Sequence, residues 1–257
     1  MFCVLKMAST TSILQGNVVK SYYPEAVIRG WLDDSAQYGV SRQFSDHYLR
    51  DFRLKTGNLV VENITLRQNY GSPVPPDSLF TPSEKHQGTL GADLFRDRIL
   101  VIDFPRSRMC VLDSLDRLWK RRTVFTEALS KRGRLHIPLT VGGRTRWFLF
   151  DTGASLFPVN TGREVWLDMA GPEAPTDTIN ANSWGEKVTF YGGGVAQKVF
   201  LGRRPLKPNM VWYHENPRLL QFNREENIDG LVGNACFFED IVLLDFRHSR
   251  FGIVKTQ

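Results

Sequence analysis

The chain has 257 residues, of which 42% are hydrophobic and 23% are charged; this is an ordinary folded composition that excludes disordered, collagen-like and coiled-coil classes. Its longest apolar run is far shorter than the ~20 residues of a membrane-spanning helix, and no signal peptide is visible, so no membrane span is expected. The net charge of +6 is concentrated in residues 115–134, where seven basic and two acidic residues give +5; such a run is typical of a solvated linker and predicts no nucleic-acid partner.

Strand signals dominate the whole chain. In chain order, the expected strands are residues 52–55, 59–66, 99–104, 123–130, 134–141, 144–150, 187–191, 198–201, 210–213 and 241–246. The strands from residue 123 to residue 150 are separated by turn sequences typical of consecutive hairpins. One helix is expected, at residues 114–122, where Leu115, Leu118 and Trp119 share one side. The fold class is therefore mainly β.

The chain contains an internal repeat. Residues 88–109 align with residues 230–251 without a gap, at an offset of 142, and eight of the 22 positions are identical. The identical pairs are Gly88/Gly230, Gly91/Gly233, Phe95/Phe237, Ile99/Ile241, Asp103/Asp245, Phe104/Phe246, Ser107/Ser249 and Arg108/Arg250. Two copies at this period predict two lobes rather than a solenoid. The expected domains are a lobe at 1–111, a basic helical linker at 112–122 and a lobe at 123–257.

The second half contains a motif that carries chemistry. An apolar strand runs straight into Asp151-Thr152-Gly153-Ala154, and the later segment Leu231-Val232-Gly233 opens the second copy of the repeat. This arrangement resembles the pepsin and retropepsin superfamily of aspartic proteases, and bacterial two-lobed members, mostly uncharacterised, are the nearest match. The resemblance implies an all-β fold of two pseudo-symmetric, acid-protease-like β-barrel lobes with an interlobe cleft.

The resemblance also assigns roles to residues of this motif. In such enzymes two carboxylates about 3 Å apart share one proton and activate a water between them, without a metal or a cofactor. The resemblance implies that Asp151 is a catalytic carboxylate and that Thr152, Gly153 and Gly233 support its loop. Gly153 would let the chain turn without a Cβ, and Thr152 would hydrogen-bond across the lobe interface.

The first lobe departs from this pattern. At an offset of 145, residues 6–14 are the counterpart of the Asp151 loop, and Lys6 falls where the second aspartate is expected. Ala8 falls where Gly153 stands in the second lobe. An ammonium beside Asp151 would hold its carboxylate ionised, but it would not supply the acidic partner. Asp103 and Asp245 are repeated, yet they follow strands in positions that suggest a structural role.

Residues 183–195 are the expected flap over the cleft. Trp184 and Tyr191 are candidates to cover substrate there, and packing of both rings against the sheet is the alternative. Residues 192–194, three glycines, have neither the lysine nor the helix of a phosphate loop and are expected to give flexibility. The cysteines and histidines fit no disulfide framework and no zinc site, and buried free thiols are expected at Cys3, Cys110 and Cys236.

The resemblance implies an aspartic-type peptidase-like protein that hydrolyses peptide bonds with a water activated at Asp151, and Lys6 at the second aspartate position is expected to impair this activity. Two alternatives remain open: an inactive pseudoprotease that binds peptides, and a homodimer that pairs Asp151 across chains. Substrate, compartment and oligomeric state are not predicted. The second lobe has 28 residues, 123–150, ahead of its loop, whereas the first has five ahead of Lys6. An uncovered sheet edge is normally avoided, so we also hypothesise that Met1 is not the ancestral start.

Overall fold

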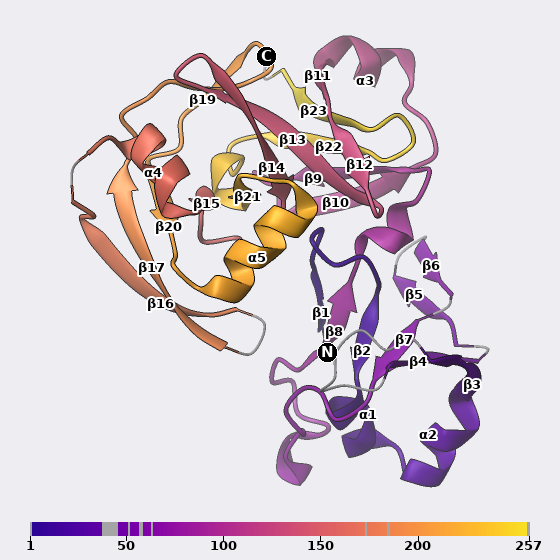
Figure 1. The fold of residues 1–257 in the computed structure, drawn as a ribbon. Helices are drawn as coiled ribbons and strands as arrows, with labels where there is room; N and C mark the ends of the chain where they lie inside the picture. The colour runs from indigo at the N-terminus through magenta and orange to yellow at the C-terminus, as the bar shows by residue number, and fades with distance from the viewer. Residues whose placement is uncertain are drawn as a thin grey trace. The chain divides into compact units, whose positions relative to one another are not determined.

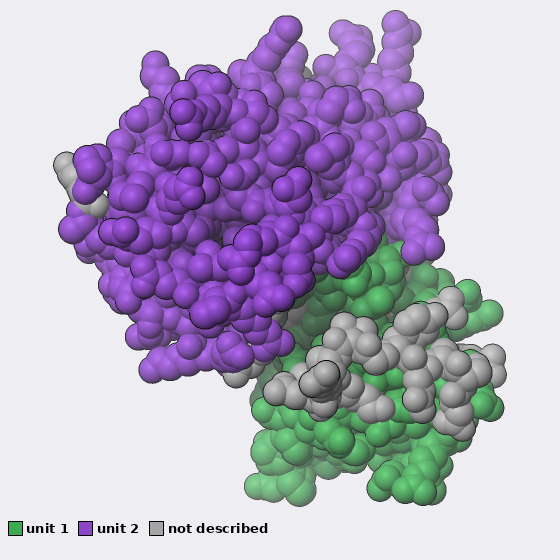
Figure 2. Space-filling model, in the orientation of Figure 1, with its two compact units in different colours: residues 1–94 green, residues 95–257 purple. Residues whose placement is uncertain are grey.

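The computed structural model describes residues 2–37, 46–50, 52–56, 59–62, 64–172, 174–183 and 186–255. The chain divides into two compact units, residues 1–94 and 95–257 (Figure 2). The lobe limits expected from the repeat, 1–111 and 123–257, stay predictions. Strands predominate, as expected, but none of the sheets built by the described residues closes into the β-barrel expected for each lobe. No helix in the described part of the chain is long and apolar enough to cross a membrane.

Unit 1 combines short strands with two helices (Figure 1). Its strands are β1 (Phe2–Leu5), β2 (Ile13–Gln15), β3 (Leu32–Gln37), β4 (Asp46–Leu49), β5 (Leu54–Thr56), β6 (Leu59–Val61), β7 (Thr65–Arg67) and β8 (His86–Leu90). Its helices are α1 (Gly16–Tyr22) and α2 (Glu25–Trp31), with 3-10 turns at η1 (Pro76–Ser78) and η2 (Ala92–Phe95). One sheet has the order β1-β8-β2-β7-β4-β3, and β5 pairs only with β6.

Unit 2 contains two sheets. Its strands are β9 (Ile99–Asp103), β10 (Arg108–Leu112), β11 (Thr123–Glu127), β12 (Leu129–Lys131), β13 (Arg134–Val141), β14 (Arg144–Phe150), β15 (Val159–Thr161), β16 (Asp177–Ser183), β17 (Glu186–Gly194), β18 (Val199–Leu201), β19 (Arg204–Leu206), β20 (Met210–Tyr213), β21 (Gly230–Val232), β22 (Ile241–Asp245) and β23 (Arg250–Val254). Its helices are α3 (Arg117–Arg122), α4 (Arg163–Ala170), α5 (Pro217–Glu226) and the 3-10 turn η3 (Asn234–Cys236).

The two units repeat one strand order. The long sheet of unit 2 contains the run β14-β21-β15-β20-β17-β16, which matches β1-β8-β2-β7-β4-β3 of unit 1 strand for strand. The senses of successive pairs also match: parallel, antiparallel, parallel, antiparallel and antiparallel in both units. A helix follows β2 and β15, and a 3-10 turn follows β8 and β21. The two units therefore share strand order and pairing senses over β1–β8 and β14–β21.

The second sheet of unit 2 joins both copies of the repeated segment, in the order β10-β9-β22-β23-β11. Strands β9 and β22 pair antiparallel with Val101 opposite Leu243. Because 101 + 142 = 243, equivalent residues meet there, and a local two-fold axis of this sheet passes between them. The two hairpins have equivalent registers, with Asp103 opposite Arg108 and Asp245 opposite Arg250.

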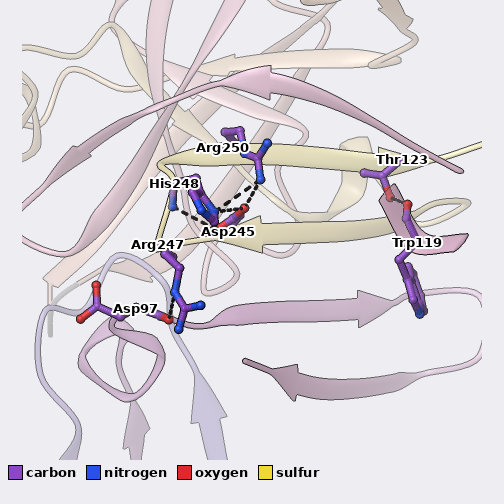
Figure 3. Close-up of polar contacts among 7 residues, drawn as sticks. All are labelled: Asp97, Trp119, Thr123, Asp245, Arg247, His248 and Arg250. Atoms are coloured by element: carbon purple, nitrogen blue, oxygen red, sulfur yellow. Dashed lines mark hydrogen bonds and ion pairs between the residues drawn. The ribbon is translucent and has the colours of Figure 1, made fainter. Parts of the chain in front are cut away.

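The repeated aspartates organise the turns of these hairpins. The carboxylate of the fully buried Asp245 accepts a hydrogen bond from His248 N (3.0 Å) and one from Arg250 Nη2 (2.5 Å), and His248 Nδ1 lies 2.9 Å away (Figure 3). Burial raises the pKa of Asp245, but these hydrogen bonds outweigh it, and the pKa lies below its usual value. In the first copy, Asp103 accepts from Arg106 N (3.2 Å) and Nη1 (3.1 Å). Both carboxylates therefore stabilise the turns of their hairpins by accepting hydrogen bonds.

Helices α4 and α5 cover opposite faces of the long sheet. The Trp166 ring of α4 lies 5.0 Å from the Tyr213 ring, whereas Leu219 of α5 packs in an apolar cluster with Trp212. Consecutive strand residues point to opposite faces, so the two helices lie on different sides of β20. The expectation of a single helix is wrong: α3 lies within residues 114–122, and α1, α2, α4 and α5 are additional.

Candidate functional site

The candidate site in unit 2 begins where β14 ends. The last three residues of β14, 148–150, are completely buried, and Asp151 follows them with 4% of its surface exposed. Strand β14 runs parallel to β21, and Asp151 N donates to Val232 O at 2.9 Å, one step beyond the last strand pair. The apolar strand therefore fixes the position at which the carboxylate leaves the sheet.

The loop after Asp151 holds its own carboxylate. Gly153 N donates to Asp151 Oδ1 at 2.8 Å, and Ala154 N donates to Asp151 O at 3.1 Å. Asn234 Nδ2 donates to Thr152 O at 3.1 Å and so ties the loop to η3. Thr152 is buried; its hydrogen bond across the lobe interface stays a prediction. These contacts orient one oxygen of Asp151 toward the loop backbone.

Gly233 packs directly against this loop. A Cβ at residue 233 would lie 2.0 Å from Ala154 O and 2.3 Å from Phe157 O, distances that no side chain can occupy. Gly233 N also donates to Pro158 O at 3.1 Å. The segment Leu231-Val232-Gly233 thus lies beside the Asp151 loop, and only glycine fits at its third position.

Lys6 holds the position in unit 1 that Asp151 holds in unit 2. Leu5 pairs with Leu90 across β1 and β8, as Phe150 pairs with Val232 across β14 and β21, and 90 + 142 = 232. Lys6 N then donates to Leu90 O at 2.9 Å, the same bond that Asp151 N makes to Val232 O. The next hydrogen bond in each loop also matches: Ser9 N donates to Lys6 O at 2.9 Å, as Ala154 N donates to Asp151 O at 3.1 Å. The backbone hydrogen bonds of the two loops therefore correspond at an offset of 145 residues.

Asp93 is a carboxylate at this loop that the sequence reasoning missed. Its two oxygens accept from Ser12 N (2.9 Å) and Ser12 Oγ (2.8 Å), and Ser12 Oγ accepts from Gly91 N at 2.9 Å. Burial raises the pKa of Asp93 despite the two bonds from Ser12. The aligned repeat shows this difference between the two copies, because Ala235 stands at the position equivalent to Asp93. Unit 1 uses side chains to hold its loop.

The expected flap is part of a hairpin formed by β16 and β17. Trp184 lies outside the described residues. The Tyr191 ring stacks on the Tyr213 ring at 5.1 Å, against a neighbouring strand. The expected flexibility of residues 192–194 is wrong, because they belong to β17 and two of them make room for tryptophans: a Cβ at Gly192 would lie 2.8 Å from Trp212, and one at Gly193 would lie 2.7 Å from Trp166.

Other chemistry finds little support in the described residues. They contain no group of three His, Cys, Asp or Glu side chains that could hold a metal ion. All three cysteines are free, and burial raises the pKa of Cys236 to about 12. Its Sγ donates to Pro158 O at 3.2 Å, which is a structural role. Cys110 is exposed and Cys3 and Cys236 are partly buried, so the expectation of three buried thiols is wrong.

Comparison with known proteins assigns no family. No family model matches the chain. A search of curated proteins also finds no match.

Proposed function

We propose that this chain has the two-lobed acid-protease fold and that it binds extended peptides at Asp151, with peptide-bond hydrolysis impaired because Lys6 replaces the second aspartate. The observation that carries the proposal is the equivalence of Lys6 and Asp151. The two residues follow parallel strands in the same register and make the same backbone hydrogen bonds, at 2.9 Å each. The repeated strand order of the two units supports the two-lobed architecture.

The substitution changes the chemistry of the pair. A catalytic dyad needs one ionised carboxylate to deprotonate water and one protonated carboxyl to protonate the substrate carbonyl. A lysine ammonium beside Asp151 would favour the ionised carboxylate and leave a base without its acid. The cleft of the proposed fold would still offer an extended peptide its binding surface. Peptide binding without efficient cleavage is the expected behaviour.

Restoring the dyad tests the proposal. The full chain is incubated at pH 6–7 with an unfolded protein, and cleavage is followed by mass spectrometry for the wild type, Lys6→Asp and Lys6→Asp/Ala8→Gly. The wild type should cut slowly or not at all, and the double variant should gain cleavage that a further Asp151→Asn change abolishes. Binding of a fluorescent extended peptide to the wild type is measured by anisotropy.

Three results would contradict the proposal. Robust wild-type cleavage abolished by Asp151→Asn would show that the chain is an active protease. Wild-type activity that rises with the square of protein concentration would point to a dimer that pairs two copies of Asp151. A folded wild type that neither binds nor cuts peptides, together with an inactive double variant, would remove the functional assignment altogether.

A further inference from the structure

Helix α5 buries one face against the long sheet of unit 2 (Figure 1). The buried side chains of this face are Leu219, Asn223 and Glu226. The first and last of them have partners on the sheet: Leu219 packs with Trp212, and the Glu226 carboxylate lies 2.7 Å from the Arg134 guanidinium. The middle residue of the face, Asn223, is the subject of the inference.

The register of the sheet identifies what lies beneath Asn223. One row of cross-strand neighbours runs from β13 to β20 and consists of His136, Leu149, Leu231, Asn160 and Trp212. Paired residues on neighbouring strands point to the same face. Both ends of this row contact α5, because its first residue lies 3.8 Å from Glu226 and its last packs on the start of the helix. Asn223 lies between these two contacts along α5, on the helix face that covers the middle of the row.

His214 joins this group from the end of β20. It comes two residues after Trp212, so its side chain points to the same face. His214 N donates to Thr161 O at 3.3 Å, which makes it a diagonal neighbour of Asn160. The His214 ring lies 5.7 Å from the ring of Phe190. Phe190 belongs to the same apolar cluster as Leu219 of α5. The histidine is completely buried.

Three buried polar side chains thus lie on this face of the sheet or on the helix face that covers it. Asn160, His214 and Asn223 are 6%, 0% and 5% exposed. Five of their polar atoms have no hydrogen-bond partner among the described protein atoms: Asn160 Oδ1, both ring nitrogens of His214 and both amide atoms of Asn223. Buried polar groups nearly always have partners. Five such atoms in one interface indicate that something else satisfies them.

The chemistry of these atoms selects the occupant. The Asn223 amide offers two donors and an acceptor, Asn160 offers an acceptor, and a neutral imidazole offers one donor and one acceptor. The three side chains form an uncharged set that mixes donors with acceptors and contains no carboxylate or thiolate. Water donates two hydrogen bonds and accepts two, and it typically satisfies buried groups of this kind. We propose that α5 and the sheet enclose a site for ordered water, held by Asn160, His214 and Asn223.

This site supports the scaffold of the Asp151 loop and does not depend on the proposed function. Water held there would link α5 to β15 and β20. Three residues separate the end of α5 from β21, and Gly233, the residue after β21, packs against the Asp151 loop. The water site therefore stabilises helix α5, which directly precedes β21, the strand beside the Asp151 loop.

Nuclear magnetic resonance tests the proposal on the full chain. Water-selective cross-relaxation is measured at pH 7 to the carbon-bound ring protons of His214, which do not exchange with solvent. A long-lived internal water should give cross-peaks with the sign of a slowly tumbling molecule. The absence of cross-peaks from an assigned His214 ring in the folded wild type would overturn the proposal.

Two leucine variants provide the control. Asn223→Leu should remove the cross-peaks and lower the urea midpoint of unfolding, because it displaces the water and leaves Asn160 and His214 without partners. Gln221→Leu adds the same side chain on the exposed face of α5 and should retain the cross-peaks. A higher midpoint for Asn223→Leu, as expected when leucine replaces an unpaired amide in a dry interface, would also overturn the proposal.

Discussion

Two buried histidines make unit 2 sensitive to mild acid. His214 and His136 are 0% and 2% exposed, and burial lowers the pKa of each from 6.5 to about 4. The folded chain therefore keeps both rings neutral over a range in which the unfolded chain protonates them. Between pH 6.5 and about 4 the unfolded state binds more protons than the folded state. The free energy of unfolding that the two neutral histidines contribute is therefore complete above pH 6.5 and is lost as the pH falls to about 4.

The His214 contribution can be worked out and removed by mutation. The shift of its pKa from 6.5 to about 4 corresponds to about 2 kcal/mol of lost stability at pH 5 and about 3 kcal/mol at pH 4, at about 1.4 kcal/mol per pKa unit. Burial is the cause of this shift, and the ring nearest to His214 that the structure gives is the uncharged Phe190 of β17, 5.7 Å away. His214→Phe keeps an aromatic ring in place and removes the titration.

The measurement is urea unfolding of wild type and His214→Phe, followed by tryptophan fluorescence at pH 7, 6, 5 and 4. The difference in unfolding free energy between the two proteins should change by about 2 kcal/mol in favour of the variant between pH 7 and 5. Loss of the water contacts shifts the variant equally at every pH and does not alter this slope. Identical pH profiles for the two proteins would refute the reasoning.

Two further substitutions test packing and charge. Gly233→Ala should lower the free energy of unfolding by more than about 3 kcal/mol, because its Cβ would meet Ala154 O at 2.0 Å. Gly194→Ala is the control: no atom lies within 4 Å of its Cβ, so it should change the free energy of unfolding by less than about 1 kcal/mol. Equal losses for the two variants would contradict the packing argument. Glu226→Gln should cost about 3 kcal/mol in urea unfolding, because it removes the carboxylate from a buried ion pair. Glu225→Gln on the exposed side of α5 is its control, and a comparable loss there would argue against the buried pair.

Features that depend on neighbouring residues could be predicted from the sequence. The expected strand 210–213 is observed as β20, and the repeated strands 99–104 and 241–246 are observed as β9 and β22, the latter two each shorter by one residue. The strand that ends at Asp151 was also predicted, because a continuous apolar run before a turn needs no information from the rest of the chain.

Features that depend on distant partners could not be predicted. The buried face of α5 includes Asn223 and Glu226, so its apolar periodicity is interrupted by groups whose partners come from strands far away in the sequence. Its ends did carry local signals: Asn216 caps the first turn, and Asn227 ends the helix at a φ of 56°. The run of glycines in β17 predicts flexibility, because the tryptophans that pack against Gly192 and Gly193 lie elsewhere in the sequence.

The register of β9 and β22 has a consequence for how the two copies can evolve. Val101 and Leu243 face each other across the local axis, and both are buried. An ancestral half-length chain could have built the same sheet by pairing its single hairpin with that of a second molecule, since each residue would meet its own copy at the axis. After fusion, a larger side chain on one strand must be offset by a smaller one on its counterpart. Substitutions at these two positions should therefore be tolerated only as compensating pairs, whereas residues far from the axis can diverge independently.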